Sequence, residues 1–407
     1  MEGITVDCNF TLEDILKAND TIKDSLKRTP VVECPTLKEL TGNNVFFKLE
    51  NLQKTGSFKL RGALNKIASL TPEERAAGVI ASSAGNHAQG VALGAAAQGI
   101  KATIVMPATA PLAKIAATKG YGAEVVLEGE VYDDAYKKAC EIQKETGATF
   151  LHPFDDKFVM AGQGTIGLEI LEDIPDVDVV LVPIGGGGII GGIAKAIKSL
   201  RPEAKVIGIE AAHAASMAEA VAVKKVCEIS TKPTIADGIA VRKAGCEPFK
   251  IVQECVDEIV TVTEDEIARA ILFLMEKSKV VAEGAGATTV AALLAGKINV
   301  KDKKVCAVIS GGNIDINLIE RVLNKALILE GRRFAFSVEL SDKVGEMAKV
   351  VAAICEENAN ILSINQTMYS ANLGITSQEA SFVLECFDKA HQEKVKAKLA
   401  SLGHRIY

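Results

Sequence analysis

The sequence predicts an α/β protein with two domains built on parallel sheets and a small ferredoxin-like domain at the C-terminal end. Short runs of β-branched residues alternate with alanine-rich helical runs through most of the chain. This alternation is typical of parallel sheets that are covered by helices on both faces. After Gly331 the predicted order becomes strand, helix, two strands, helix and strand, which is the split βαβ arrangement.

The βαβ alternation predicts the elements of the first part of the chain one by one. In order, we expect strand 79–81, helix 88–98, strand 102–105, helix 111–119, strand 123–127, helix 131–146, strand 177–183, helix 189–200, strand 205–209, strand 304–309 and helix 318–329. So many elements exceed one ordinary core. We therefore expect a domain of residues 1–330, with a small subdomain at about 50–150 and a large subdomain from the remainder.

Residues 331–407 form the separate C-terminal domain of this prediction. The alternating run at 334–340 predicts a half-buried strand. The elements expected after it are helix 345–358, strand 360–365, strand 377–387, helix 389–402 and a last short strand at 404–407.

Composition restricts the classes of function. The chain has 407 residues, 48% apolar and 24% charged, with a net charge of −6 and no basic block. These are globular values, and they argue against nucleic acid as a partner. We find no apolar run long enough to predict a membrane span, and the acidic start does not resemble a signal peptide. We expect a cytoplasmic protein whose scattered cysteines are free thiols.

Lys59 is the strongest candidate for covalent chemistry. It lies in the run GSFKLRGA at 56–63, at the start of a predicted helix. Two glycine-rich loops lie far downstream, at 183–188 and 310–313. A lysine able to form an aldimine, a phosphate cradle and a small polar loop together indicate pyridoxal 5′-phosphate (PLP) as the cofactor.

The glycine-rich loop contains Gly185, Gly186, Gly187 and Gly188, between an apolar strand and an apolar helix. Glycines let main-chain N–H groups approach a phosphate, and the helix N-terminus favours its negative charge. The same loop satisfies the G-x-G-x-x-G pattern of dinucleotide sites, with Glu210 where a ribose ligand is expected. A tight turn without any ligand is a third interpretation, so this loop alone leaves the question open.

A second strand-to-helix junction, SSAGNHA at 82–88, offers small polar residues and main-chain donors that suit a carboxylate. Asn86 is a candidate donor to an anionic ring oxygen. His87 is either a base or, as we favour at a helix start, an orienting or capping residue. In the loop 310–313, Ser310 is a candidate partner for a ring nitrogen, unless the loop is a simple turn. A hydroxyl there keeps the pyridine near neutral, which suits β-elimination better than transamination.

Four motifs, GSFKLRGA, SSAGNHAQG, PIGGGG and ISGGNID, occur in this order within roughly residues 10–330. Together they resemble the fold-type-II PLP enzymes, and within these the threonine dehydratases (threonine ammonia-lyases). A dinucleotide-binding oxidoreductase has no use for the lysine and ISGGN motifs, so the resemblance favours PLP over NAD. Residues 331–407 resemble an ACT domain, because DKVGE at 342–346 is similar to the ACT loop between first strand and first helix, with Val344 where proline is commoner.

The resemblance implies a role for each candidate residue. Lys59 would be the Schiff-base lysine, and Phe58 would pack against the cofactor ring. Asn86 would bond the ring 3-oxygen, and Ser310 would meet the ring nitrogen. Gly185–Gly188 would hold the phosphate. The substrate carboxylate would be bound by main chain and side chains of Ser83, Ala84, Gly85, Asn86 and His87.

Two departures from related serine racemases are informative. Those enzymes carry a serine where this chain has Ala84, and that serine is the acid/base on the opposite face of the cofactor. They also bind a divalent cation through a glutamate and an aspartate six residues later. Here Glu210 is present but Ser216 takes the second position, so we expect only a monovalent or weak divalent cation at Glu210.

The resemblance therefore implies elimination of ammonia from L-threonine to give 2-oxobutanoate, with L-serine as a secondary substrate. The alternatives are a serine racemase or serine-specific dehydratase and, from another class, a PLP-free amino-acid sensor. The expected partners are an amino-acid substrate, an amino-acid or nucleotide effector acting through the ACT-like domain, and further copies of the chain in a dimer or tetramer.

Overall fold

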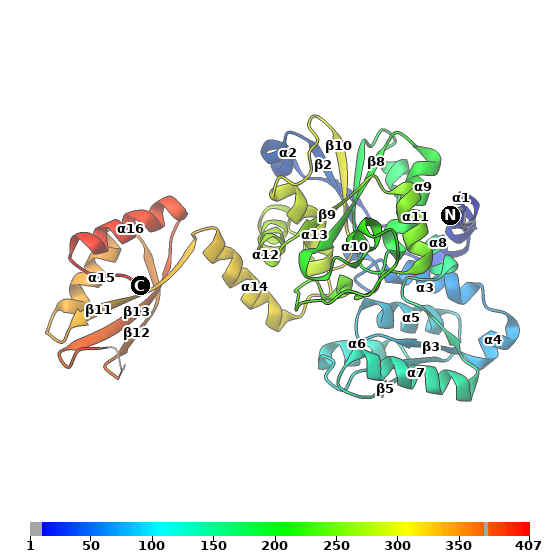
Figure 1. Ribbon diagram of the computed structural model, residues 1–407, viewed down its shortest axis with the longest axis horizontal. Helices are drawn as coiled ribbons and strands as arrows, with labels where there is room; N and C mark the ends of the chain where they lie inside the picture. The colour runs from blue at the N-terminus through cyan, green and yellow to red at the C-terminus, as the bar shows by residue number, and fades with distance from the viewer. Residues whose placement is uncertain (1–9, 370–372) are drawn as a thin grey trace. The chain divides into compact units, whose positions relative to one another are not determined.

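The computed structural model describes residues 10–369 and 373–407 and divides into two compact units (Figure 1). The first unit ends at Ile314 and the second begins at Asp315. The sequence placed this boundary at 330. The difference is helix α14 (Ile316–Leu329), which contacts strand β11 (Arg333–Ser341) and so is grouped with the second unit.

The larger sheet of the first unit has six strands in the order β1-β2-β10-β7-β8-β9. Its strands are parallel except β1, which pairs with β2 in the antiparallel sense. Buried side chains of β7, β8 and β10 alternate between two faces, as parallel strands covered on both sides require. These strands are β1 (Val31–Glu33), β2 (Asn44–Leu49), β7 (Val179–Pro183), β8 (Lys205–Ala211), β9 (Glu258–Val262) and β10 (Lys304–Ile309).

The smaller sheet has four parallel strands in the order β5-β4-β3-β6 and lies within the expected small subdomain. One face packs on α3 and α5, and the other packs on α7 (Figure 1). Its strands are β3 (Val79–Ser82), β4 (Ala102–Met106), β5 (Glu124–Leu127) and β6 (Thr149–Phe150). The helices of this region are α3 (Lys59–Ala68), α4 (Pro72–Ala77), α5 (Asn86–Ala97), α6 (Leu112–Gly120) and α7 (Tyr132–Thr146).

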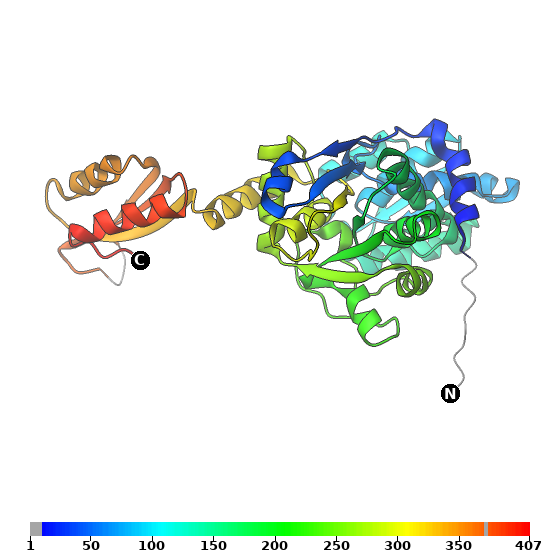
Figure 2. The same ribbon diagram turned by 90° about the horizontal axis from the view of Figure 1, so that it is seen from above.

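Helix α8 (Lys157–Asp173) packs against both α3 and α9 (Gly188–Leu200). Glycines make the approach close: a Cβ on Gly162 would lie 2.5 Å from the carbonyl oxygen of Arg61, and one on Gly192 would lie 2.3 Å from that of Met160. The main chains of these helices are therefore in direct contact. Figure 2 shows the same unit from a second direction.

The remaining helices of the first unit are mostly short. They are α1 (Leu12–Ile22), α2 (Pro35–Thr41), α10 (Ser216–Ala222), α11 (Cys246–Cys255), α12 (Glu264–Phe273), α13 (Gly284–Leu294), the π-helical turn Leu274–Ser278 and the single 3₁₀ turns Lys23–Ser25, Glu50–Leu52, Ala212–Ala214 and Asp237–Ile239. Within the residues that the structure describes, no helix has both the length and the apolar content needed to cross a membrane.

The second unit has the strand and helix order that the sequence predicted. It consists of α14 followed by β11, α15 (Glu346–Glu356), β12 (Asn360–Thr367), β13 (Ser377–Glu385) and α16 (Lys389–Ser401). The antiparallel sheet has the order β11-β13-β12, and Ile406 forms a single bridge to Val338 on the free side of β11. The expected last strand is thus reduced to this bridge. Phenylalanines at 334, 336 and 382 stack in the core.

Candidate active site

Lys59 is the first residue of α3, and its partly buried amine has no carboxylate partner among the residues that the structure describes. Its Nζ donates a hydrogen bond to the carbonyl oxygen of Pro153 at 2.8 Å and lies 5.1 Å from the centre of the Phe58 ring. Burial lowers the pKa of Lys59 to about 8, although the negative charge of Glu283 opposes this shift. An amine with this pKa loses its proton far more easily than an exposed lysine, which is the requirement for a nucleophile or a base.

Two loops that are far apart in the sequence are hydrogen-bonded to each other beside Lys59. The N–H of Phe58 donates to the carbonyl oxygen of Ser310 at 3.1 Å, and the N–H of Gly312 donates to that of Gly56 at 2.9 Å. Ser310 directly follows strand β10 and is buried. The structure therefore brings together the lysine motif and the ISGGN motif, which the sequence could relate only by analogy.

The four glycines Gly185–Gly188 form the turn from β7 into α9. Gly187 has φ +97°, and a Cβ there would lie 2.6 Å from Met217 and Pro248. A Cβ on Gly186 would lie 2.3 Å from the ring of Phe154, which follows the residue that accepts the Lys59 hydrogen bond. The first N–H groups of a helix have no acceptor within it. The turn thus offers main-chain donors at a helix N-terminus, close to the segment that holds Lys59.

The junction of β3 and α5 carries the residues Ser83, Ala84, Gly85, Asn86 and His87. A Cβ atom added to Gly85 would meet no other atom within 4 Å, so the main chain there is accessible to a small ligand. The Nε2–H of His87 donates to the carbonyl oxygen of Leu151 at 2.9 Å. Burial, together with the charge of Lys59, lowers the pKa of His87 to about 3, so its imidazole is neutral. This geometry suits the orienting role better than that of a base.

The sequence alone did not identify Glu283 and Asn313 as site residues, yet both form hydrogen bonds with Asn86. The Nδ2 of Asn86 donates to Oε1 of Glu283 at 2.7 Å, and Nδ2 of Asn313 donates to Oδ1 of Asn86 at 2.8 Å. Burial raises the pKa of Glu283 to about 7, and the charge of Asp237 adds to this shift. The available signal was a lone carboxylate inside the otherwise small and apolar run 281–287.

Glu210, our candidate cation ligand, is the last residue but one of strand β8 and caps the short helix α10. Its two carboxylate oxygens accept hydrogen bonds from the N–H groups of Met217 at 2.9 Å and Ala218 at 2.8 Å. Burial raises the pKa of Glu210 to about 7. Within the described ranges, no group of three or more histidine, cysteine or acidic side chains is arranged to hold a metal. A monovalent or weak divalent cation at Glu210 stays a prediction.

A family model described as pyridoxal-phosphate dependent enzyme matches residues 22–311. The chain belongs to this family. PLP is therefore the cofactor of this family member, and its two mainly parallel sheets are the fold-type-II arrangement that the sequence predicted.

Individual relatives agree with the family assignment. An L-threonine ammonia-lyase of Thermotoga maritima is 51% identical over 397 residues, which cover 98% of this chain and 99% of the relative. The structure of a processed threonine deaminase isoform from Solanum lycopersicum matches with a TM-score of 0.75 and 38% identity over 77% of this chain and 92% of that one. A maize serine racemase structure matches with a TM-score of 0.74 and 34% identity over 79% and 98%.

The residues present in this family member fit PLP. The turn at Gly185–Gly188 is too crowded for side chains but offers main-chain donors, as a phosphate cradle does. Lys59 has the lowered pKa that a covalent attachment needs. Asn86 keeps one amide N–H without a partner among the described residues, because its other N–H and its carbonyl oxygen are engaged. The phosphate, the covalent attachment and the ring 3-oxygen of the cofactor thus each have a group that fits them.

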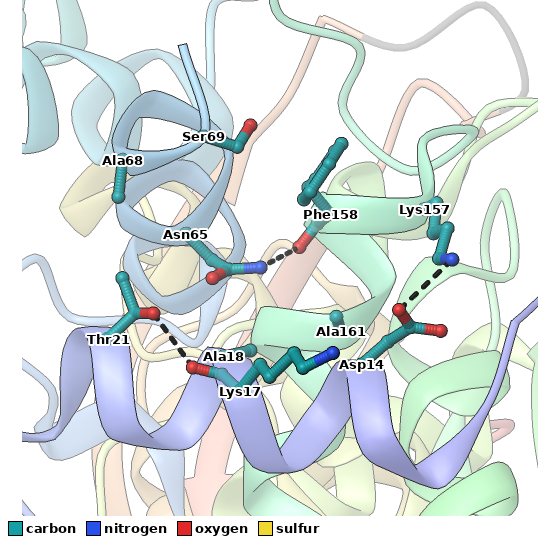
Figure 3. A pocket seen from close by; sticks show the side chains of 10 residues that line it. All are labelled: Asp14, Lys17, Ala18, Thr21, Asn65, Ala68, Ser69, Lys157, Phe158 and Ala161. Atoms are coloured by element: carbon teal, nitrogen blue, oxygen red, sulfur yellow. Dashed lines mark hydrogen bonds and ion pairs between the residues drawn. The ribbon is translucent and has the colours of Figure 1, made fainter.

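A separate cavity of about 160 Å³ lies on the opposite end of α3, among α1, α3 and α8 (Figure 3). Asp14 pairs there with Lys157 at 3.0 Å, and Nδ2 of Asn65 donates to the carbonyl oxygen of Phe158 at 2.8 Å (Figure 3). None of the candidate residues described above lines this cavity. This cavity is therefore not part of the candidate active site.

Proposed function

We propose that this PLP enzyme is a threonine ammonia-lyase, which converts L-threonine to 2-oxobutanoate and ammonia and accepts L-serine to give pyruvate. The observation that supports this proposal best is Lys59, whose amine has a pKa of about 8 and adjoins the Ser310 loop. The threonine ammonia-lyases and deaminases among its relatives support the choice of reaction.

The residues divide the reaction among them. The chemistry that PLP supplies when bound is an electron sink for the charge left after the substrate loses its Cα proton. Lys59 would hold the cofactor, and its Nζ would accept the Cα proton of the substrate. Ser310 would meet the ring nitrogen, and a neutral hydroxyl partner would leave the ring unprotonated. Loss of water and hydrolysis then balance the overall reaction to 2-oxobutanoate and ammonia.

The segment Ser83–His87 is our proposed site for the substrate carboxylate. It begins helix α5, where unpaired N–H groups favour a negative charge. The accessible main chain at Gly85 and the neutral, immobilised ring of His87 shape this site without adding a competing charge. Replacing Gly85 with a bulky residue would close it, whereas alanine has room there.

Purified protein tests the proposal directly. We expect a visible absorbance band of bound PLP and formation of 2-oxobutanoate from L-threonine, with slower formation of pyruvate from L-serine. A protein without the visible band would favour the PLP-free sensor. Serine-only turnover would favour the serine-specific dehydratase.

Serine racemase is the second candidate, because a maize racemase has a similar structure. Racemisation needs a proton donor on the cofactor face opposite Lys59, and Ala84 has no acidic proton there. Replacing Ala84 with serine should therefore increase formation of D-serine relative to pyruvate, as measured by chiral chromatography. An unchanged ratio would show that position 84 does not separate the two activities.

We propose that the second unit is an ACT-like module with regulatory and assembly roles. It has the strand and helix order typical of such modules, and its edge strand β12 leaves Leu362 and Ile364 exposed, as pairing with another copy would require. An amino-acid effector, such as isoleucine or valine, would act by binding two conformations with different affinity, typically about 1–3 kcal/mol of coupling. Nucleotide effectors, the dimer or tetramer and the cytoplasmic location stay predictions.

Deleting residues 331–407 tests the regulatory role. All candidate cofactor residues precede this segment, so the absorbance band should persist. Any response of the threonine saturation curve to branched-chain amino acids should disappear. If the full-length protein responds to no amino acid or nucleotide, only the assembly role survives.

A further inference from the structure

A chain of three polar side chains lies behind the cofactor-binding groups. Glu283, which precedes α13, accepts a hydrogen bond from Asn86 at 2.7 Å. Asn86 accepts one from Asn313 at 2.8 Å, and Nδ2 of Asn313 also donates to the carbonyl oxygen of Thr55 at 2.8 Å. The chain therefore connects the starts of α13 and α5 with the Ser310 loop and the Lys59 loop.

The arrangement determines which way the Asn86 amide faces. An amide group has one oxygen acceptor and two N–H donors, and a rotation of its plane by 180° exchanges the two ends. Glu283 offers only acceptors when ionised, and Asn313 offers a donor at Nδ2. The rotated amide would place its oxygen against the carboxylate and its N–H groups against another NH₂. Both contacts would then be lost, so the observed orientation is strongly favoured.

Close packing keeps Glu283 in this place. Its side chain is 5% exposed, and a Cβ on Gly311 would lie 2.4 Å from its Oε1. Only glycine at 311 leaves room for the carboxylate. The N–H of Glu283 also donates to the carbonyl oxygen of Gly311 at 3.1 Å. Gly311, the first glycine of the ISGGN motif, thus leaves room for this carboxylate beside Asn86.

We infer that Glu283 and Asn313 are positioning residues, which hold the Asn86 amide so that its remaining N–H is committed to the 3-oxygen of the PLP ring. This inference rests on the proposed role of Asn86. An amide free to rotate would present its oxygen to that anionic ring oxygen for part of the time, and the two would repel each other. Fixing the amide removes that unfavourable orientation before the cofactor binds.

The charges around Glu283 are consistent with this role. Lys59 faces it from α3, and Asp237 and Lys114 form an ion pair at 2.9 Å nearby. Burial and Asp237 raise the pKa of Glu283 to about 7, while Asn86, Lys114 and Lys59 lower it. A protonated Glu283 still offers an oxygen acceptor to Asn86, and the Asn313 donor opposes rotation of the amide in both protonation states.

Two variants of Glu283 separate the hydrogen bond from the charge. Glu283→Gln keeps an oxygen acceptor of the same reach, and Glu283→Leu removes it. We expect the dissociation constant of PLP, measured by fluorescence titration of the apoprotein, to rise about 10-fold in Glu283→Leu, the effect of one charge-assisted hydrogen bond. We expect a change of less than about 3-fold in Glu283→Gln. Glu258→Leu and Glu258→Gln, at the exposed start of β9, are the matched controls.

Asn313→Asp tests the inference independently, because it places an acceptor oxygen where Oδ1 of Asn86 needs a hydrogen-bond donor. We expect weaker PLP binding and a shifted absorbance maximum of bound PLP, with the thermal midpoint of the apoprotein near that of wild type. Unchanged PLP affinity in both Glu283→Leu and Asn313→Asp, or an equal loss in the two Glu283 variants, would overturn the inference. Failure of the wild-type protein to bind PLP would instead overturn the proposed function.

Discussion

Lys59 and Arg61 lie two residues apart at the start of α3, yet the surroundings of their charges are opposite. Arg61 is fully buried and donates to Glu50 at 2.8 Å, to Glu169 at 2.6 Å and to Thr165 at 3.1 Å. Burial alone would lower the pKa of Arg61, but Glu50 and Glu169 raise it above its ordinary value. Lys59 is partly buried, its only hydrogen-bond acceptor among the described residues is a neutral carbonyl, and its pKa falls to about 8.

The difference between Arg61 and Lys59 shows how one helix can be anchored by one cation and present another as a reactive amine. Arg61, Glu50, Glu169 and the buried Lys48 form a balanced set of two cations and two anions that links β2, α3 and α8. A buried charge with a partner stays charged and anchors the structure, whereas one without a partner tends to give up its charge. Arg61 thus anchors helix α3 through its ion pairs, and Lys59, two positions earlier, supplies the reactive amine.

Removing the unpaired cation should have the largest effect. Lys59→Ala should lower kcat/KM for threonine by at least about 10⁴-fold, because it removes both the covalent attachment and the base. Lys119→Ala, on the exposed face of α6, is the control. Borohydride reduction of the wild-type protein followed by peptide mapping should find the pyridoxyl group on Lys59. A label on another lysine would contradict the assignment.

Removing the paired cation should damage stability instead. Arg61→Met leaves Glu50 and Glu169 buried with fewer partners, so the free energy of unfolding in urea should fall by about 3–5 kcal/mol. Adding Glu50→Gln should recover part of that loss, because the two residues are directly coupled. If the double variant is less stable than the sum of the single changes predicts, the pairing argument is wrong.

The smallest effect concerns two buried carboxylates with opposite pKa shifts. Burial would raise the pKa of Glu169, but Arg61 and Lys48 lower it, whereas burial raises that of Glu210 to about 7. The stability that Glu210 contributes is full below its unfolded pKa of about 4.5 and is lost as pH rises through about 7. Glu210→Gln should therefore make the free energy of unfolding in urea vary less between about pH 4.5 and 7, by on the order of 2–3 kcal/mol. A variant with the same pH dependence as the wild type would contradict the raised pKa of Glu210.

Much of the fold could be predicted from local sequence. The strands and helices between 79 and 146 and those between 331 and 402 have clear periodicity, and the structure contains each of them within a few residues, whereas the last strand expected at 404–407 is only a single bridge. Helix α8 was not predicted. Its glycines disfavour a helix, and burial on nearly all sides leaves no polar face to reveal the period.

The sequence by itself determined the cofactor class, because the lysine, glycine and serine motifs each carry their own local chemistry. Only the tertiary structure decided which groups act on one another. Asn86 and Glu283 are 197 residues apart, and Arg61 and Glu169 are 108 apart. No local pattern encodes such pairs, since their contact depends on how parallel strands order themselves and on where glycines let helices meet. A buried side chain's charge state depends on those neighbours, and for that reason the pKa values of Lys59 and Glu283 appear only in the folded chain.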